Sequence, residues 1–382
     1  MRIIKNEMKK IFNSINLLLV GLITIIIWIL FMSINIEYFV KDNHGTAYNT
    51  SVYLLEQYGT TMDENEFKDF KKYREKKAQE AAKYLSTKEV LVKSGIHTYE
   101  DFESIYNDEK KYSNRKELEE IYSKIVFEDD VYVFWLIQEL DYFIERYENK
   151  DNWIGLGYEN TAQKERHYEI INKGDGNSPL NFIIIRNYNT LIFGIIILVL
   201  ISIPILISPI FINDNKNKVN YLQYSSRIGR TIFSKKIIAS VLSAIIITSI
   251  QLGILFIAYK ANNTYMFWDC SISSYISDIA SWFDITFGEY IILSVVLTYI
   301  VGVVTSVITI LVSSNSNNYI TAIGTQIPIM FVLGGILKSV GMYDLTTTYY
   351  PKYTLHILYG SLIVTSILLI TRRIKKEKVL DI

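Results

Sequence analysis

The sequence predicts an all-α membrane protein with six transmembrane helices, an N-terminal interfacial helix and a mainly helical extracytoplasmic domain between spans 1 and 2. Three observations support this prediction. Half of the 382 residues are apolar, and they gather into blocks about as long as a bilayer crossing. About 150 mostly polar residues separate the first block from the second. Basic residues concentrate beside some of the blocks and not beside others.

The first 16 residues predict a basic amphipathic helix that lies in the cytoplasmic interface. Ile4, Met8 and Ile11 fall on one side of such a helix, and Lys5 and Lys9 fall on another. The first span follows at 17–36, LLLVGLITIIIWILFMSINI, which carries no charge. This block is too long for the apolar region of a signal peptide, and it lacks a small-residue cleavage site.

Five further apolar blocks predict the remaining spans. They lie at 191–212, 237–259, 290–312, 319–341 and 353–370. Their central portions contain no Asp or Glu, which argues mildly against a proton- or sodium-driven carrier. The main polar groups are Gln251, Gln326, Thr298, Ser306, Thr309 and Thr325. We interpret them as interhelical hydrogen-bonding groups, with a translocation path as the alternative.

The distribution of Lys and Arg predicts the orientation of the spans. Residues 1–16, the segment 213–236 and the tail 371–382 together hold 15 basic residues and four acidic ones. Basic residues are retained on the cytoplasmic side of the membrane. Both termini and 213–236 are therefore expected in the cytoplasm, whereas 37–187 and the loop 260–289 are expected outside.

The insertion at 37–187 holds 30 acidic and 21 basic residues, a formal charge of −9. Apolar residues recur at three- and four-residue steps in four stretches, which predicts helices at 63–86, 98–112, 113–125 and 158–174. The apolar stretch 131–144 is too short for a span, and we expect a buried helix there.

Two residue types in this insertion leave alternatives open. Its many tyrosines are expected to pack inside a small helical bundle, with contact to an amphipathic ligand or a partner subunit as the alternative. His167 stands between Glu165 and Glu169, and we interpret these three side chains as a solvated helix face.

No catalytic or cofactor motif is found in the chain. Cys270 is the only cysteine, so an intramolecular disulfide is impossible. The phosphate-binding pattern G-x-x-x-x-G-K-[ST] does not occur. We expect no bound cofactor, no metal and no nucleic acid. A membrane enzyme that uses the external carboxylates Glu128, Asp129 and Asp130 is an alternative, although such carboxylates are normally a solvated helix face.

The cytoplasmic segment 213–236, NDNKNKVNYLQYSSRIGRTIFSKK, carries the most specific local pattern. A polar start, an apolar helix with Leu222, a turn, an Arg and a terminal Lys resemble the corresponding segment of permease subunits of ABC-2-type exporters. The order of interfacial helix, span, optional external domain and five spans is also similar. The chain departs from the pattern at Val219 and Asn220, where Gly or Thr is usual, and Asp214 stands for the usual Glu.

The resemblance implies an ATP-driven export permease in a bacterial plasma membrane, built as a homodimer or heterodimer. ATP and Mg²⁺ would bind a separate ATPase subunit, and the cargo would be an amphipathic peptide, a drug or a lipid. The segment is then a coupling helix that docks on the ATPase. Its predicted partner-binding residues are Tyr221, Leu222, Tyr224, Ser225, Ser226, Gly229, Arg230 and Phe233.

Two other functions stay open. The chain could be a sensor or scaffold whose external domain binds a ligand, although such proteins usually carry a larger cytoplasmic output domain. It could also be a sodium-efflux permease of the same class. For the coupling segment itself, the alternative is that its aromatic rings sit in the lipid interface while its bases attract the anionic leaflet.

Overall fold

In the computed structural model, the described residues are mainly helical, and no β-strand occurs among them. The structure describes residues 2–39, 45–107, 111–112, 114–129, 131–151, 160–219, 222, 229, 231–342 and 345–379. The chain divides into two compact units. The bundle unit comprises Met1–Phe39, Arg186–Met266 and Gly288–Ile382, and the insert unit comprises Val40–Ile185 and Phe267–Phe287.

Six helices are long and apolar enough to cross a membrane, which confirms the predicted number. The six spans are Ser14–Glu37, Phe182–Lys216, Thr231–Asn262, Phe287–Ser314, Tyr319–Met342 and Thr354–Glu377. The first span consists of α2 (Ser14–Ile27), a π-helical turn and α3 (Ser33–Glu37), and the next four contain α11 (Phe182–Lys216), α13 (Thr231–Tyr259), α14 (Phe287–Ser314) and α15 (Tyr319–Ile336). The sixth lies within α16 (Thr354–Val379). The chain is therefore an all-α, multi-pass membrane protein.

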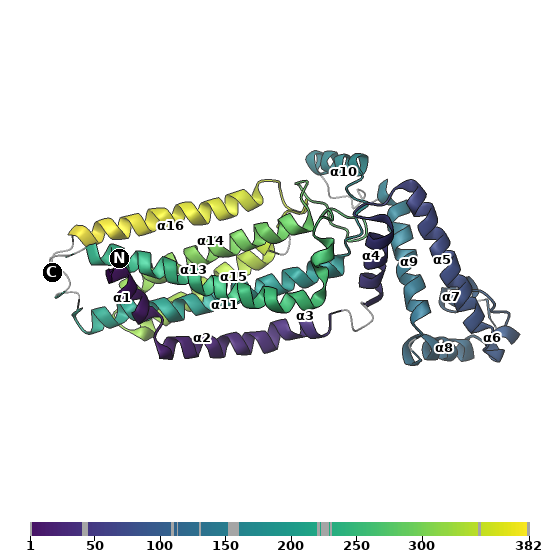
Figure 1. Cartoon of the computed structure of the whole chain (residues 1–382), viewed down its shortest axis with the longest axis horizontal. Helices are drawn as coiled ribbons and strands as arrows, with labels where there is room; N and C mark the ends of the chain where they lie inside the picture. Colours follow the sequence, from purple (N-terminus) through teal and green to yellow (C-terminus); the bar gives the residue numbers. More distant parts are fainter. Residues whose placement is uncertain are drawn as a thin grey trace. The chain divides into compact units, whose positions relative to one another are not determined.

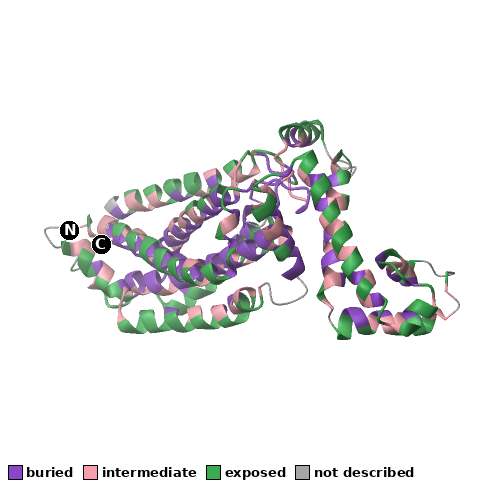
Figure 2. Ribbon diagram, turned by 45° about the vertical axis from the view of Figure 1, so that its right-hand side comes forward, coloured by how far each residue is buried: buried purple, intermediate pink, exposed green. Residues whose placement is uncertain are grey.

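The spans of the bundle unit differ in how deeply they are buried. About two thirds of the most apolar part of α11 is buried, and just over half of that part of α14. The corresponding share is 17% for α2 and 6% for α16. Figure 1 shows α2 and α16 at opposite flanks of the bundle, and Figure 2 shows both helices mostly exposed. Helices α11 and α14 therefore form its centre.

Helix α1 (Arg2–Ile11) confirms the predicted N-terminal amphipathic helix. It packs against α13 and buries Glu7 and Ile11. Asn13 then ends it and caps α2, because its side chain accepts a hydrogen bond from the backbone N–H of Asn16 at 3.0 Å. The Asn16 side chain donates to the carbonyl oxygen of Ile11 at 3.1 Å, which fixes the corner between the two helices.

The insert unit is built from seven described helices. They are α4 (Gly45–Tyr58), α5 (Glu64–Leu85), α6 (Glu89–Lys93), α7 (Tyr99–Asn107), α8 (Arg115–Ser123), α9 (Tyr132–Glu148) and α10 (Thr161–Lys173). Helix α9 lies between two apolar clusters, with Phe134 in one and Phe143 in the other. This confirms the helix expected at 131–144 as a core helix rather than a span.

Most of the connection between α13 and α14, residues 267–287, also belongs to the insert unit. Within 267–287, the carbonyl oxygen of Ile276 accepts a hydrogen bond from the Tyr142 hydroxyl at 3.2 Å. Asp278 forms an ion pair with Arg146 of α9 at 2.8 Å. The sequence predicts only a loop between two spans here, because nothing in it shows that the segment folds together with residues far upstream.

Five described tyrosines of the insert unit are buried, as expected, whereas the others are partly buried or exposed. Tyr99 and Tyr122 are buried with Phe102 in one core cluster, and Tyr147 is buried in the other. The ring of Tyr147 stacks on that of Phe67 with centroids 4.0 Å apart. Such pairs stabilise beyond the area that they bury.

The interpretation of His167 as part of a solvated face is wrong. His167 is 5% exposed. Burial and the neighbouring charge of Arg166 both lower the pKa of His167, which favours the neutral imidazole. Helix α10 is so polar that apolar periodicity in its sequence does not show which face is buried. That face is determined by contacts with the segment 267–287.

Candidate functional site at the base of the bundle unit

The predicted coupling segment connects α11 to α13. Helix α11 ends at Lys216 and α13 begins at Thr231, at the end of the bundle where α1 lies and α16 ends (Figure 1). We call this end the base. Of the eight predicted partner-binding residues, Tyr221, Tyr224, Ser225, Ser226 and Arg230 lie outside the described residues.

The three described members of this set differ in environment. Leu222 is 74% exposed, as a docking residue would be. Gly229 has a φ of 54°, a left-handed conformation that favours glycine. Phe233, which the sequence suggests as an exposed anchor, is 6% exposed. The expectation of exposure is wrong for Phe233, and its assignment to a partner stays a prediction.

Phe233 is buried because its ring packs between two other spans. The ring meets Phe211 of α11 edge to face, with centroids 6.0 Å apart. The guanidinium carbon of Arg373 in α16 lies 4.8 Å from the centroid of Phe233. This is a cation–π contact, worth more when it is removed from water.

A buried ion pair connects the two helices that flank the segment. The ammonium group of Lys236 in α13 pairs with the carboxylate of Asp214 in α11, and the residues are 3% and 8% exposed. The Lys236 ammonium also lies 5.9 Å from the ring centroid of Phe211. Charge counting places Lys236 among the bases that face the membrane surface, whereas the structure buries it against a carboxylate.

Arg373 connects α16 to α14 at the same end. Its Nε donates to the Ser314 hydroxyl at 3.2 Å, and its Nη2 donates to the Ser314 carbonyl oxygen at 3.4 Å. Its guanidinium also forms an ion pair with the buried carboxylate of Glu377, one helical turn further on. The sequence offers no local signal that separates Arg373 from the surrounding basic tail.

Two asparagines at the end of α11 complete the base. The Asn213 side-chain oxygen accepts a hydrogen bond from the Tyr319 hydroxyl of α15 at 3.0 Å. The Asn215 side chain donates to the carbonyl oxygen of Ser316 at 3.2 Å, just after α14. Polar contacts therefore connect the ends of α11, α13, α14, α15 and α16 around the segment. This network is our candidate functional site.

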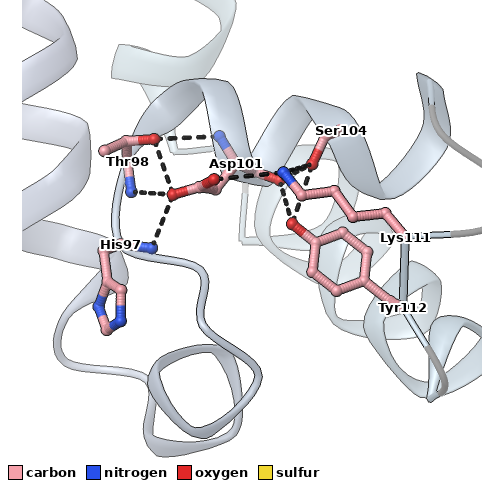
Figure 3. A network of polar contacts seen from close by, with 6 residues as sticks. All are labelled: His97, Thr98, Asp101, Ser104, Lys111 and Tyr112. Atoms are coloured by element: carbon pink, nitrogen blue, oxygen red, sulfur yellow. Dashed lines mark hydrogen bonds and ion pairs between the residues drawn. The ribbon is translucent and has the colours of Figure 1, made fainter.

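A second polar network lies in the insert unit and is structural (Figure 3). One carboxylate oxygen of Asp101 accepts hydrogen bonds from the backbone N–H groups of His97 and Thr98 at 3.3 and 3.2 Å. The other carboxylate oxygen lies 3.3 Å from the Lys111 ammonium. The Thr98 hydroxyl accepts from the Asp101 backbone N–H, so the pair forms a reciprocal cap at the start of α7.

The pKa of Asp101 reflects that capping role. Burial raises the pKa, but the hydrogen bonds from Thr98 and His97 and the contact with Lys111 outweigh burial and lower it. A carboxylate held ionised by helix-capping donors is a poor general base. Glu128 and Asp129 are exposed, and Asp130 lies outside the described residues. Among the described residues, no group of three or more His, Cys, Asp or Glu could hold a metal ion.

Searches against protein-family models, curated proteins and solved structures find no match to the chain. The assignment of a function therefore rests on the residues and contacts described above.

Proposed function

We propose that the chain is the permease subunit of an ATP-driven exporter in a bacterial plasma membrane, with both termini in the cytoplasm. A separate ATPase subunit binds ATP and Mg²⁺ and docks on the segment between α11 and α13. Two permease copies, identical or homologous, form the path for an amphipathic or hydrophobic cargo. The chain itself hydrolyses nothing in this proposal.

The observation that carries this proposal is the polar network at the base. A docked partner that displaces the segment 217–230 pulls on Asp214 and Lys236, which flank it. These residues belong to α11 and α13, and the network extends from α11 to α14 through Asn215 and to α15 through Asn213. Displacement at one point would therefore reach most of the spans, as energy transfer from an external motor requires.

The alternative, a sensor or scaffold, uses the same network in the opposite direction. The insert unit would bind a ligand, and the base would change shape without transport. A sodium-efflux permease is a variant of the main proposal, although the spans hold no acidic residue in their central portions. Transport of labelled cargo into inside-out vesicles with ATP separates the exporter from the sensor.

The coupling assignment is tested at Leu222, because this side chain is 74% exposed. With the chain and its ATPase co-purified, Leu222→Asp should abolish permease-stimulated ATP turnover while membrane insertion persists. The matched control Leu222→Met keeps an apolar side chain and should retain turnover. If Leu222→Asp turns over ATP like the unmodified chain, the docking assignment is wrong.

A further inference from the structure

Polar side chains form a buried line along α13 and α14 in the bundle unit. On α13 the line consists of Ser240, Ser243, Thr248 and Gln251, all at most 2% exposed. On α14 it includes Thr305 and Ser306, both fully buried. The sequence predicts interhelical hydrogen bonds for such groups. That prediction is confirmed for two glutamines, since Gln251 donates to Ser202 at 2.9 Å and Gln326 to Ser208 at 3.0 Å.

The hydroxyl groups of the line, unlike these glutamines, form no interhelical hydrogen bond among the described residues. Within the described part of the chain, the hydroxyl oxygens of Ser240, Ser243, Thr248, Thr305 and Ser306 and the side-chain oxygen of Gln251 have no hydrogen-bond partner. Three other hydroxyls of α14 donate to carbonyl oxygens four residues earlier: Thr298 to Ser294, Thr309 to Thr305, and Ser313 to Thr309. The interhelical prediction is therefore wrong for Thr298, Ser306 and Thr309. It is also wrong for Thr325, which donates to the carbonyl oxygen of Thr321 in its own helix at 2.9 Å.

Two contacts show how the polar residues of α13 and α14 line up. Ser249 and Tyr299 share a hydrogen bond at 2.8 Å. A Cβ atom at Gly302 would lie 2.8 Å from the Thr248 hydroxyl oxygen, so the helices approach closely here. Followed toward the base, this antiparallel register places Ser243 at the level of Ser306. The unpartnered groups of the two helices therefore share one seam.

The seam reaches from the middle of the bundle to its base. Lys236, one helical turn before Ser240, pairs with Asp214 at the lower end. From Lys236 to Gln251 the seam is about 22 Å long at 1.5 Å per residue, most of the hydrocarbon thickness. Each buried polar group without a partner costs about 1–3 kcal/mol. Six such atoms lie in one seam, so we expect them to form hydrogen bonds with molecules other than the protein.

We propose that this seam binds a file of water molecules inside a single copy of the chain, continuous with the Asp214–Lys236 pair. Water fits because each molecule can donate to and accept from hydroxyl groups on facing helices, as buried waters do at unsatisfied polar sites. The side chains of Val199 and Ile203 in α11 also lie close to Gly302, so the seam has hydroxyl groups on one side and an apolar wall on another. The seam is thus a hydrated path within one copy, separate from any cargo path between two copies.

Cysteine accessibility to Ag⁺ tests this proposal, because Ag⁺ is small and reacts with thiolates, which form where water can solvate them. Ser243→Cys and Ser306→Cys are compared with Ala239→Cys and Val304→Cys, which are buried apolar positions of the same two helices that do not belong to the line. All variants carry Cys270→Ser. Thiols that remain after Ag⁺ treatment are alkylated in denaturant and counted by a gel shift.

The seam cysteines should react at least about tenfold faster than the two controls, and equally slow reaction at all four positions overturns the proposal. Thr305→Val gives a second measurement that does not depend on cysteine variants folding. It should lower the melting temperature and slow Ag⁺ reaction at Ser306→Cys, since the methyl group displaces a bound water. A raised melting temperature would contradict the proposal, because it would mean that the Thr305 hydroxyl has no water partner and that its removal relieves the cost of burying it.

Discussion

The side chain of Arg166 donates a hydrogen bond from Nε to the carbonyl oxygen of Ser281 at 2.8 Å, across 115 residues of sequence. The same guanidinium pairs with Asp284, which also contacts Lys173 at 2.6 Å. Helix α10 therefore holds the segment 267–287 in the insert unit. The segment leads directly into α14, and residues 260–266 connect it to α13.

Replacement of Arg166 by Ala should loosen this segment. The buried guanidinium is lost and the Ser281 carbonyl is left without its donor, which we expect to cost about 2 kcal/mol. Protease cleavage within 267–287 of the folded protein should then rise by about 30-fold, because cleavage follows local opening. The control Arg115→Ala removes only an ion pair within α8 and should leave that cleavage unchanged. Equal cleavage in both variants would contradict the assignment.

Substitution of Gly176 tests how closely the segment 267–287 packs against residues upstream of α11. A Cβ atom at Gly176 would lie 2.3–2.8 Å from three ring atoms of Tyr275, far inside contact distance. Gly176→Ala should therefore destabilise the insert unit by about 1–3 kcal/mol through overpacking. The measurement is thermal unfolding of Gly176→Ala in the native and Tyr275→Ala backgrounds. The Ala substitution should be nearly neutral once the ring is absent, and an equal cost in both backgrounds would exclude the clash.

Glu139 of α9 should make the insert unit less stable at neutral pH than in mild acid. Burial raises the pKa of Glu139 from 4.5 to about 7, against a hydrogen bond from Asn181 that lowers it. The folded protein keeps this proton up to about pH 7, whereas the unfolded chain loses it near pH 4.5. The contribution of Glu139 to stability is therefore most favourable below pH 4.5, becomes less favourable as the pH rises to about 7, and stays lower by roughly 3 kcal/mol above it.

Glu139→Gln should remove that pH dependence, because the amide cannot ionise. The variant should match the native protein near pH 4.5 and melt at a higher temperature at pH 8. Thermal unfolding between pH 4.5 and 8 measures both effects. Glu120→Gln, at an exposed position of α8, is the control. Parallel profiles for native protein and Glu139→Gln would refute the role of this carboxyl group.

Lys236→Met should be strongly destabilising, because it leaves the Asp214 carboxylate buried without its ammonium partner. Loss of one member of a buried ion pair costs about 3–5 kcal/mol. Lys235, the next residue, is only partly buried, so Lys235→Met should have little effect. The yield of folded protein in membranes and its melting temperature in detergent measure the difference.

The double variant Asp214→Asn with Lys236→Met separates pairing from side-chain volume. It should recover most of the stability lost in Lys236→Met, because no uncompensated charge remains. If the double variant is as unstable as Lys236→Met alone, then packing by the lysine stem, and not its charge, holds the base together.

The sequence by itself determined the number of spans, the amphipathic helix α1 and the helical character of the insertion. These features depend on local properties, since a run of apolar residues as long as a bilayer is thick specifies a span regardless of its neighbours. Helix α9 was predictable in the same way, because Glu139 and Asp141 interrupt its apolar run.

Only the tertiary structure decided which polar and basic residues face the interior. Lys236 and Lys235 are neighbours in one basic run, and Arg373 stands in another, yet Lys236 is buried against Asp214 and Arg373 packs on Phe233 and Ser314. The tertiary structure also decided that Phe233 is buried, that the segment 267–287 folds within the insert unit, and that the seam hydroxyl groups along α13 and α14 have no partner among the described residues. Each depends on contact between residues that lie from about 20 to more than 100 positions apart, and residue type and spacing along one helix carry no information about what the other helix places opposite.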